Sequence, residues 1–500
     1  MVRPEFNQKK PTSTFSPENV RYFGMVLLIA LVLSAGFYVW VRRYEKAEKA
    51  KQLAVLRVFP RSAQDVETLY RLHYLSSPVV QDSVIEFRGR FSDLLKLNRL
   101  GIPTAAVAAI DYNGKVPKDY PGVGAIERKM LTLAARFPNW AVLDTLGTTA
   151  FRHHPILVLK ISDNPHLNED EPGVLFMAGL HAREPAGTLF LLALADSLLR
   201  EQREDPDLRG LLGQVELFLV PLVNVDGYDY IVQNHVRFPF WRKNLRDNNE
   251  DGKFSPAVDG VDLNRNFDFN WGDFRETQTT SWFYKGPRPF SEPETQALRN
   301  LARKKHFVLM VDYHSYGQAV LFPWTKEMRP PDYEILHDLA LGYARRCHRA
   351  HSHRPYDVMP LDGKAGQSAN WFYAQFRTLS FLVELGSEYF PPKKDLQPIF
   401  RQNKRAALYL LKRIFQTGIE GHISDAQTGN PLPAIVQLQN DFSPVVAPCR
   451  ADGQFGHFWR LLKPGAFTVS FQMSGYRTES RSVILEAGEH KIVDVRMWRR

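Results

Sequence analysis

Apolar runs of strand length alternate with helix-like segments between residues 156 and 384, and this alternation constrains the fold most strongly. Runs that lack regular polar alternation are typical of strands buried on both faces of a sheet. Such strands alternating with helices predict an α/β fold, in which a mixed, mainly parallel sheet is covered by helices. Ligands of such open sheets bind at the carboxyl ends of the strands. The predicted strands are Ile156–Ile161, Leu175–Leu180, Val215–Val223, Phe307–Asp312 and Ser380–Glu384.

Four polar residues stand at or just beyond these strand ends. His181 and Glu184 lie in the stretch H-A-R-E-P, where Pro185 suits the first position of a helix. A neutral imidazole and a carboxylate are ligands of catalytic zinc, and His314 offers a third ligand from another strand. Glu384 closes an apolar strand, where burial would give it a pKa suited to a general base. Taken singly, each is more often structural: a capped helix start, a strand-end histidine or a salt-bridged glutamate.

Two further segments offer groups that bind anions. Trp241-Arg242-Lys243-Asn244 is basic beside an aromatic residue, and the stretch from Gly260 to Phe267 contains Asn264 and Arg265. Arginine grips a carboxylate with two hydrogen bonds and asparagine adds an uncharged donor, a combination that suits the free C-terminus of a peptide. Separately, each segment would more often be a solvated loop.

Together these segments resemble the zinc metallocarboxypeptidase family, which has the carboxypeptidase A-like fold. The motifs H-x-R-E, W-R-K, D-L-N-R-N, F-S-E-P-E, D-x-H-S-Y and F-x-x-E-L occur in the family's order between residues 121 and 415. The resemblance implies that His181, Glu184 and His314 bind one zinc ion. It also implies hydrolysis of the C-terminal peptide bond of peptides or proteins.

The resemblance also implies roles for five further side chains. Glu384 would take a proton from the zinc-activated water and pass it to the leaving amine. Arg242 would polarise the scissile carbonyl and stabilise the oxyanion. Asn264 and Arg265 would hold the terminal carboxylate of the substrate, and Arg183 would assist substrate binding.

One part of the family's pattern is missing. Many members carry a mobile tyrosine shortly before a G-x-S-x-D-W-like turn, which aligns here with Ser368–Trp371. This alignment puts Asp362 at the tyrosine position, a looser one puts Met359 there, and Tyr356 fits neither. Ala369 takes the specificity-pocket position, and a small uncharged residue there disfavours a strict preference for basic terminal residues.

Residues 22–41 form an apolar run without charge, long enough to cross a bilayer, with aromatic residues at both edges. A cleaved signal peptide is the alternative, but the long leader contains Glu5 and Glu18, and no small-x-small site closes the run. We therefore expect a single-pass membrane protein. Basic residues on both sides leave the orientation open, and the resemblance alone implies a catalytic domain outside the cytoplasm, periplasmic or extracellular.

The segments on either side of the predicted sheet have other patterns. Strands at 55–59 and 83–87 with helices at 62–73 and 91–97 predict a small α+β unit that resembles an inhibitory pro-segment. Short strands after residue 416 predict a small antiparallel β sandwich, similar to the transthyretin-like domain of regulatory carboxypeptidases. The predicted organisation is a tail (1–21), a transmembrane helix (22–41), a charged stalk (42–52), the α+β unit (53–112), the zinc carboxypeptidase domain (113–416) and the transthyretin-like domain (417–500).

Charge, cysteine content and one acidic stretch restrict the binding partners, disulfides and metal ions that we expect. The formal net charge of +10 comes without a long Lys/Arg block or a helix-turn-helix pattern, so we expect no nucleic-acid partner. The only cysteines, Cys347 and Cys449, exclude a disulfide framework. The stretch from Asp247 to Gly252 alternates like a calcium loop, but Val258 stands where the closing glutamate belongs, which favours a plain polar turn over a Ca²⁺ site.

Two alternative functions remain open on the sequence. An enzyme of the same fold could cut cell-wall stem peptides at diaminopimelate-type linkages, because such peptides also carry carboxylates. A catalytically inactive relative could act as a binding module, although the complete set of predicted zinc ligands and Glu384 argues against that interpretation. The zinc content of the purified protein would separate an enzyme from such a module.

Overall fold

The computed structural model describes residues 53–58, 62, 64–65, 68–69, 85–109, 116, 120–233, 241–256, 258–274, 276–324, 329–350, 352–361, 365–439 and 441–500. The chain forms two compact units, divided after Asp111. The predicted tail, transmembrane helix and charged stalk, residues 1–52, lie outside the described residues. Within the described ranges, no helix is long and apolar enough to span a bilayer.

The first unit contains a three-stranded sheet. Strand β1 (Leu53–Val58) lies in the middle and pairs antiparallel with β2 (Ile85–Arg90) and β3 (Thr104–Ala109). Helix α3 (Phe91–Arg99) follows β2 directly. Two strands and this helix agree with the sequence pattern, whereas β3, an alanine-rich strand, was not predicted. Most of the predicted helix at 62–73 lies outside the described residues.

The second unit is built on an eight-stranded sheet in the order β10-β9-β11-β8-β6-β7-β5-β4. Pairing is parallel between β10 and β9 and from β11 through β8 and β6 to β7, and antiparallel at β9–β11, β7–β5 and β5–β4. The predicted α/β fold with a mixed sheet is confirmed. The strands are β4 (Ala141–Thr148), β5 (Pro155–Ile161), β6 (Gly173–Ala178), β7 (Glu216–Val220), β8 (Phe307–His314), β9 (Ala319–Phe322), β10 (Asp357–Pro360) and β11 (Leu379–Glu384).

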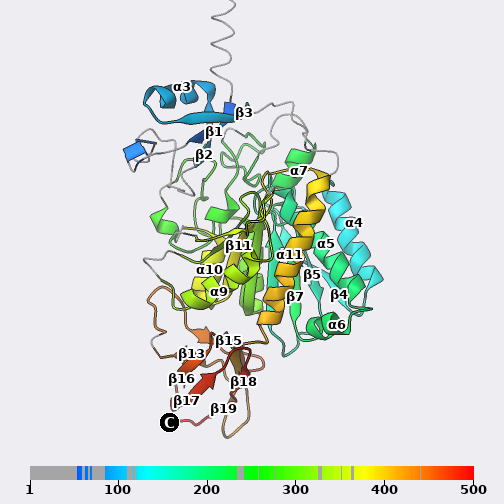
Figure 1. Ribbon diagram of the computed structural model, residues 1–500, viewed down its shortest axis with the longest axis vertical. Helices are drawn as coiled ribbons and strands as arrows, with labels where there is room; N and C mark the ends of the chain where they lie inside the picture. The colour runs from blue at the N-terminus through cyan, green and yellow to red at the C-terminus, as the bar shows by residue number, and fades with distance from the viewer. Residues whose placement is uncertain are drawn as a thin grey trace, which may run out of the picture. The chain divides into compact units, whose positions relative to one another are not determined.

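The centre of this sheet is buried on both faces. In β6, residues Val174 to Ala178 are all 0% exposed, which explains why the strand shows no polar alternation. Successive side chains of β8 point to opposite faces: Asp312 contacts Ser368 on one side, and Tyr313 packs against Phe190 on the other. Helices therefore cover both faces, as Figure 1 shows.

Helices α5, α9 and α11 pack next to one another on the Tyr313 face, and α4 packs beside α5. Helix α10 begins at Ser368 on the Asp312 face. Proline takes an N-terminal position in α5, α6 and α8, where its missing N–H costs no hydrogen bond. The helices are α4 (Val123–Arg136), α5 (Pro185–Glu201), α6 (Pro206–Leu212), α7 (Val225–Gln233), α8 (Pro293–Lys304), α9 (Tyr333–Ala344), α10 (Ser368–Phe376) and α11 (Lys393–Arg413), with short 3-10 turns at Leu263–Arg265 and Trp271–Asp273.

The C-terminal β region has two sheets, consistent with a sandwich. One has the order β15-β12-β18 with β19 also on β12, and the other has the order β14-β13-β16-β17. The expectation of a purely antiparallel region is wrong, because β12 pairs parallel with both β18 and β19. The strands are β12 (Gly418–Asp425), β13 (Ile435–Leu438), β14 (Cys449–Arg450), β15 (His457–Leu461), β16 (Gly465–Gln472), β17 (Glu479–Leu485), β18 (His490–Ile492) and β19 (Val495–Met497).

Four buried charges join the α/β domain to the C-terminal β region. Asp332 and Arg377 come from the α/β domain, at the start of α9 and the end of α10. Asp441 and Arg460 come from the β region, and each arginine contacts both aspartates. Arg377 Nε lies 2.7 Å from Asp332, and Arg460 lies 3.1 Å from Asp332 and from Asp441. The two arginines hold the pKa of Asp332 below its usual value against the effect of burial.

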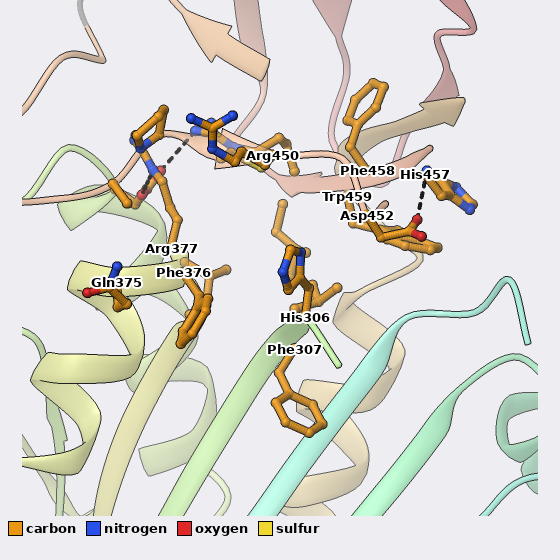
Figure 2. Close-up of a pocket in the computed structure, with 18 residues that line it drawn as sticks. His306, Phe307, Gln375, Phe376, Arg377, Arg450, Asp452, His457, Phe458 and Trp459 are labelled. Atoms are coloured by element: carbon orange, nitrogen blue, oxygen red, sulfur yellow. Dashed lines mark hydrogen bonds and ion pairs between the residues drawn. The ribbon is translucent and has the colours of Figure 1, made fainter. Parts of the chain in front are cut away.

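A cavity of about 380 Å³ lies beside this network, between the two parts of the second unit. Figure 2 shows His306, Phe307 and Phe376 on the side of the α/β domain, facing Arg450 and Trp459 of the β region. Cys449, the second of the two cysteines, also lines this cavity and is a free, buried thiol.

Replacing Arg460 with methionine is expected to destabilise the chain by about 3–5 kcal/mol, because it leaves buried carboxylates without one of their two cationic partners. Urea unfolding of the purified chain measures the loss. The matched control is Arg329→Met, which removes an exposed ion pair of 3.2 Å with Glu334 and should cost no more than about 1 kcal/mol. Equal stability of the two variants would contradict this assignment.

Candidate active site

The three central strands β6, β8 and β11 run parallel, so their carboxyl ends meet at one edge of the sheet. Register pairs Ala178 with Tyr313, and it pairs Glu384 directly with His314. Gly179 follows β6 with φ +72, and a Cβ there would come within 2.7 Å of Leu222, so the tight turn requires glycine. This turn brings the segment that carries His181 to the same edge.

His181, Glu184 and His314 converge as the sequence predicts. Glu184 Oε1 lies 2.9 Å from His181 Nδ1, and Oε2 lies 2.8 Å from His314 Nδ1. The two Nδ1 atoms are 3.0 Å apart. All three side chains are buried, and they form one of the groups able to hold a metal ion in the described part of the chain.

Two aspartates hold the far nitrogens of the histidines. Asp262 Oδ1 lies 3.2 Å from His181 Nε2, and Asp312 Oδ2 lies 3.0 Å from His314 Nε2. A carboxylate on the outer nitrogen fixes the tautomer and orientation of a metal-binding imidazole. Asp312 is itself held by the Ser368 hydroxyl, which donates a hydrogen bond of 2.6 Å. Both aspartates belong to the D-L-N-R-N and D-x-H-S-Y motifs, but sequence analysis gave them no role; a carboxylate close in sequence to a candidate ligand was the available signal.

Burial and neighbouring charges shift the pKa values of all three proposed metal ligands. Burial would raise the pKa of Glu184, but the charges and hydrogen bonds of His181 and His314 outweigh it and hold this pKa well below its usual value. Burial and the nearby Arg242 lower the pKa of His181. Burial opposes protonation of His314, but Asp312 and Glu184 raise its pKa well above the usual value.

This donor set fits zinc. Two imidazole Nδ1 atoms and one carboxylate face each other, while the outer nitrogens are already occupied by aspartates. Three protein ligands leave one coordination position for water, as in catalytic zinc sites. Zinc binding requires neutral imidazoles, so it would compete with protonation of the two histidines.

Glu384 lies beside this triad, half-buried at the end of β11. Burial and the negative charge of Glu184 raise its pKa to about 8. Its Oε2 atom has no hydrogen-bond partner among the described residues, so the carboxyl remains available to a ligand. Gly317 keeps this space open, because a Cβ at that position would approach the Glu384 Cβ to 2.9 Å.

Arg242 stands on the other side of Glu184. Its Nε donates a hydrogen bond of 2.9 Å to Asp262 Oδ2, and its Nη1 lies 3.9 Å from Glu184 Oε1. Asp262 therefore contacts both His181 and Arg242. Asn244, two residues further on, donates to Glu292 over 2.8 Å, which anchors the loop that carries Arg242.

Asn264 and Arg265 lie in the same buried area. The Asn264 amide nitrogen is 3.4 Å from His314 Nε2, and its oxygen accepts a hydrogen bond of 2.9 Å from Ser368 N. The Arg265 guanidinium lies over the rings of Phe274 and Phe283. Burial lowers the pKa of Arg265 to about 10, and its Nε has no hydrogen-bond partner among the described residues. Arg265 is thus a buried cation with spare donor capacity.

Arg183 lies between two aromatic rings, and its Nε is 3.9 Å from Glu184 Oε1. Its guanidinium lies 4.9 Å from the centre of the Trp282 ring and 4.6 Å from that of Tyr389. Such stacking holds a cation in place while its edge donors stay free for a substrate. The two aromatic residues were not predicted, because they follow different motifs and are brought together only by the fold.

The remaining predicted positions differ in outcome. Tyr356 is buried, and its hydroxyl accepts a hydrogen bond of 3.4 Å from Gly386 N, so it is a packed side chain. Asp362 lies outside the described residues. Ala369 is 0% exposed within α10. In the predicted polar turn, Asp247 accepts a backbone hydrogen bond of 2.7 Å from Gly252.

The site can be compared with known proteins. Carboxypeptidase D of Rattus norvegicus is 24% identical over 376 residues, which are 71% of this chain and 25% of that protein. The chain thus spans about a quarter of this relative's length. Inactive metallocarboxypeptidase ecm14 of Schizosaccharomyces pombe (strain 972) is 30% identical over 277 residues, 51% of this chain and 54% of that protein. The solved structure of carboxypeptidase A from Helicoverpa armigera has the same fold, with a TM-score of 0.61, 20% identity and coverage of 73% of this chain and 97% of that chain.

Residues 126–406, more than half of the chain, match the family described as zinc carboxypeptidase. The match contains the triad, Glu384 and every other predicted site residue. The description of this family names zinc, which agrees with the donor set of the triad. The protein belongs to the zinc carboxypeptidase family.

Proposed function

We propose that this protein is a zinc-dependent carboxypeptidase that removes the C-terminal residue of peptides or proteins. One observation carries the proposal: a zinc-type triad, a free carboxyl group at Glu384 and a buried cation at Arg265 lie together at one edge of the sheet. Zinc-dependent hydrolysis needs the metal-binding triad and the carboxyl group of Glu384. A preference for the C-terminal residue needs a cation, here Arg265, that binds the terminal carboxylate. Arg265 supports the terminal carboxylate because it is buried, cationic and has an Nε without a partner among the described residues.

Zinc bound by His181, Glu184 and His314 would polarise the scissile carbonyl and make a water molecule acidic. Glu384 accepts the proton from the attacking water and later donates it to the leaving amine. Its pKa of about 8 without metal would fall near a dication, because a positive charge favours the carboxylate form. Arg242, held by Asp262, offers its remaining N–H groups to the oxygen that becomes negative.

A catalytically inactive protein is the alternative from another class, since one relative is named inactive. This chain keeps three ligand side chains within hydrogen-bond distance of each other, and it keeps Glu384 beside them. Zinc binding together with peptide hydrolysis is therefore the better-supported function.

We also propose that residues 22–41 anchor the protein in a membrane, with the catalytic domain outside the cytoplasm. The length and uniform apolarity of this run support an anchor. We infer further that the C-terminal β region is a transthyretin-like domain, because its two small sheets enclose a core of their own. Fractionation of cells that express the full chain or a chain without residues 1–52 tests the anchor: only the full chain should remain with the membranes.

Glu384→Gln is expected to lower kcat at least about 100-fold, because the amide cannot accept the proton of the attacking water. The measurement is C-terminal trimming of a mixed peptide library, followed by mass spectrometry. Loss of single terminal residues by the unaltered protein would also reveal its preference. Glu388→Gln, the same change at an exposed position four residues away, is the matched control and should trim normally.

The outcomes of this assay separate the alternatives. Equal trimming by Glu384→Gln and the unaltered protein would remove Glu384 from the proposed role. Absence of trimming by the unaltered protein, with zinc bound, would favour a cell-wall substrate or an inhibited precursor. Absence of both trimming and zinc would favour the binding module.

Arg265→Gln is expected to raise KM for a peptide with a free C-terminus about 10- to 100-fold, because a charge-assisted hydrogen bond contributes roughly 1.5–3 kcal/mol. A peptide with an amidated C-terminus should be a poor substrate of the unaltered protein and should change little. Arg288→Gln, at an exposed position, is the control. An equal effect on both peptides would show that Arg265 does not bind the terminal carboxylate.

A further inference from the structure

A second group of possible metal ligands shares no residue with the active-site triad. It consists of Asp170, His422 and His457. Asp170 lies in the loop between β5 and β6 of the α/β domain, whereas His422 and His457 lie on β12 and β15 of the C-terminal β region. Antiparallel pairing places the two histidines directly opposite each other, with ring centres 4.1 Å apart. A cross-strand histidine pair of this kind presents two imidazoles on one face of a sheet.

The aspartate contacts both imidazoles. Its Oδ2 lies 2.6 Å from His422 Nε2, and its Oδ1 lies 2.7 Å from His457 Nδ1. The proposed zinc ligands of the active site have a similar arrangement, with a carboxylate 2.9 Å and 2.8 Å from two imidazoles. The two groups therefore share both their chemistry and their close spacing.

Neighbouring side chains hold the two histidines in place. Asp494 Oδ1 lies 3.5 Å from His422 Nδ1, the position of an outer carboxylate on a metal-binding imidazole. The indole of Trp459 stacks on His457 with ring centres 3.6 Å apart. Figure 2 shows His457 and Trp459, which are two residues apart on β15, at the seam between the two parts of the unit. His457 is 8% exposed, so its orientation is set by packing.

We propose that Asp170, His422 and His457 form a second metal site, which takes a divalent ion of the zinc type. Two imidazoles and one carboxylate are ligands that suit Zn²⁺, and partial exposure of the site leaves room for water as a further ligand. The site would be structural, because Glu420, the half-buried carboxylate two residues before His422, is paired with His490 over 3.2 Å. It would connect the α/β domain to the C-terminal β region and stabilise that contact when zinc is bound.

The test counts zinc ions per chain. The full-length protein is equilibrated with zinc chloride, dialysed against zinc-free buffer and analysed by atomic emission. We expect two zinc ions for the unaltered protein, one for His422→Ala, one for His181→Ala and none for the double variant. His166→Ala is the control: it changes an exposed histidine in the same loop as Asp170 and should still bind two zinc ions.

Asp170→Asn is the second variant, because it keeps the size of the side chain while removing the carboxylate charge. It should also bind one zinc ion, and zinc should raise its melting temperature less than that of the unaltered protein. One zinc ion in the unaltered protein, lost in His181→Ala, would overturn the second site. Two ions in both His422→Ala and Asp170→Asn would overturn it as well. One zinc ion in the unaltered protein, kept in His181→Ala and lost in His422→Ala, would contradict the proposed function and leave this proposal standing.

Discussion

Parallel pairing of β6, β8 and β11 is the constraint on which the site depends. Register places Glu384 beside His314, and β6 delivers the loop with His181 and Glu184 to the same edge. A shift of one residue in any of these pairings would turn the strand-end side chains to the opposite face. The packing that buries these strands therefore also sets the spacing of the catalytic groups.

Asp262 contacts both a proposed zinc ligand and the arginine proposed to bind the oxyanion. It holds His181 through one oxygen and Arg242 through the other, so the orientation of a zinc ligand and that of the oxyanion-binding cation depend on one carboxylate. Burial opposes ionisation of Asp262, but Arg242, His181 and Arg265 together hold its pKa far below the usual value. The cation and the metal ligand are therefore positioned before substrate arrives, and neither has to reorganise during the reaction.

Local pattern predicted the buried strands and the residues at their ends, because burial on both faces leaves a continuous apolar run. It missed β4 and β10, which are edge strands with partly exposed side chains, and it also missed β9, a buried apolar strand of only four residues. It also missed the parallel pairing of β12, since short strands of similar composition do not reveal their partners. Pairs such as Asp332 with Arg460 join a helix start to a distant strand, and each residue alone resembles an ordinary surface charge in the sequence. Only the fold shows which of them become buried.

The buried charges between the two parts of the second unit have a consequence for the order in which the protein matures. Asp332 and Arg377 are synthesised well before Asp441 and Arg460, so a nascent chain holds half of this four-charge network until β15 leaves the ribosome. During this interval the far end of the sheet carries one aspartate and one arginine that water can still solvate. Burial of all four charges is therefore complete only when β15 packs against the α/β domain.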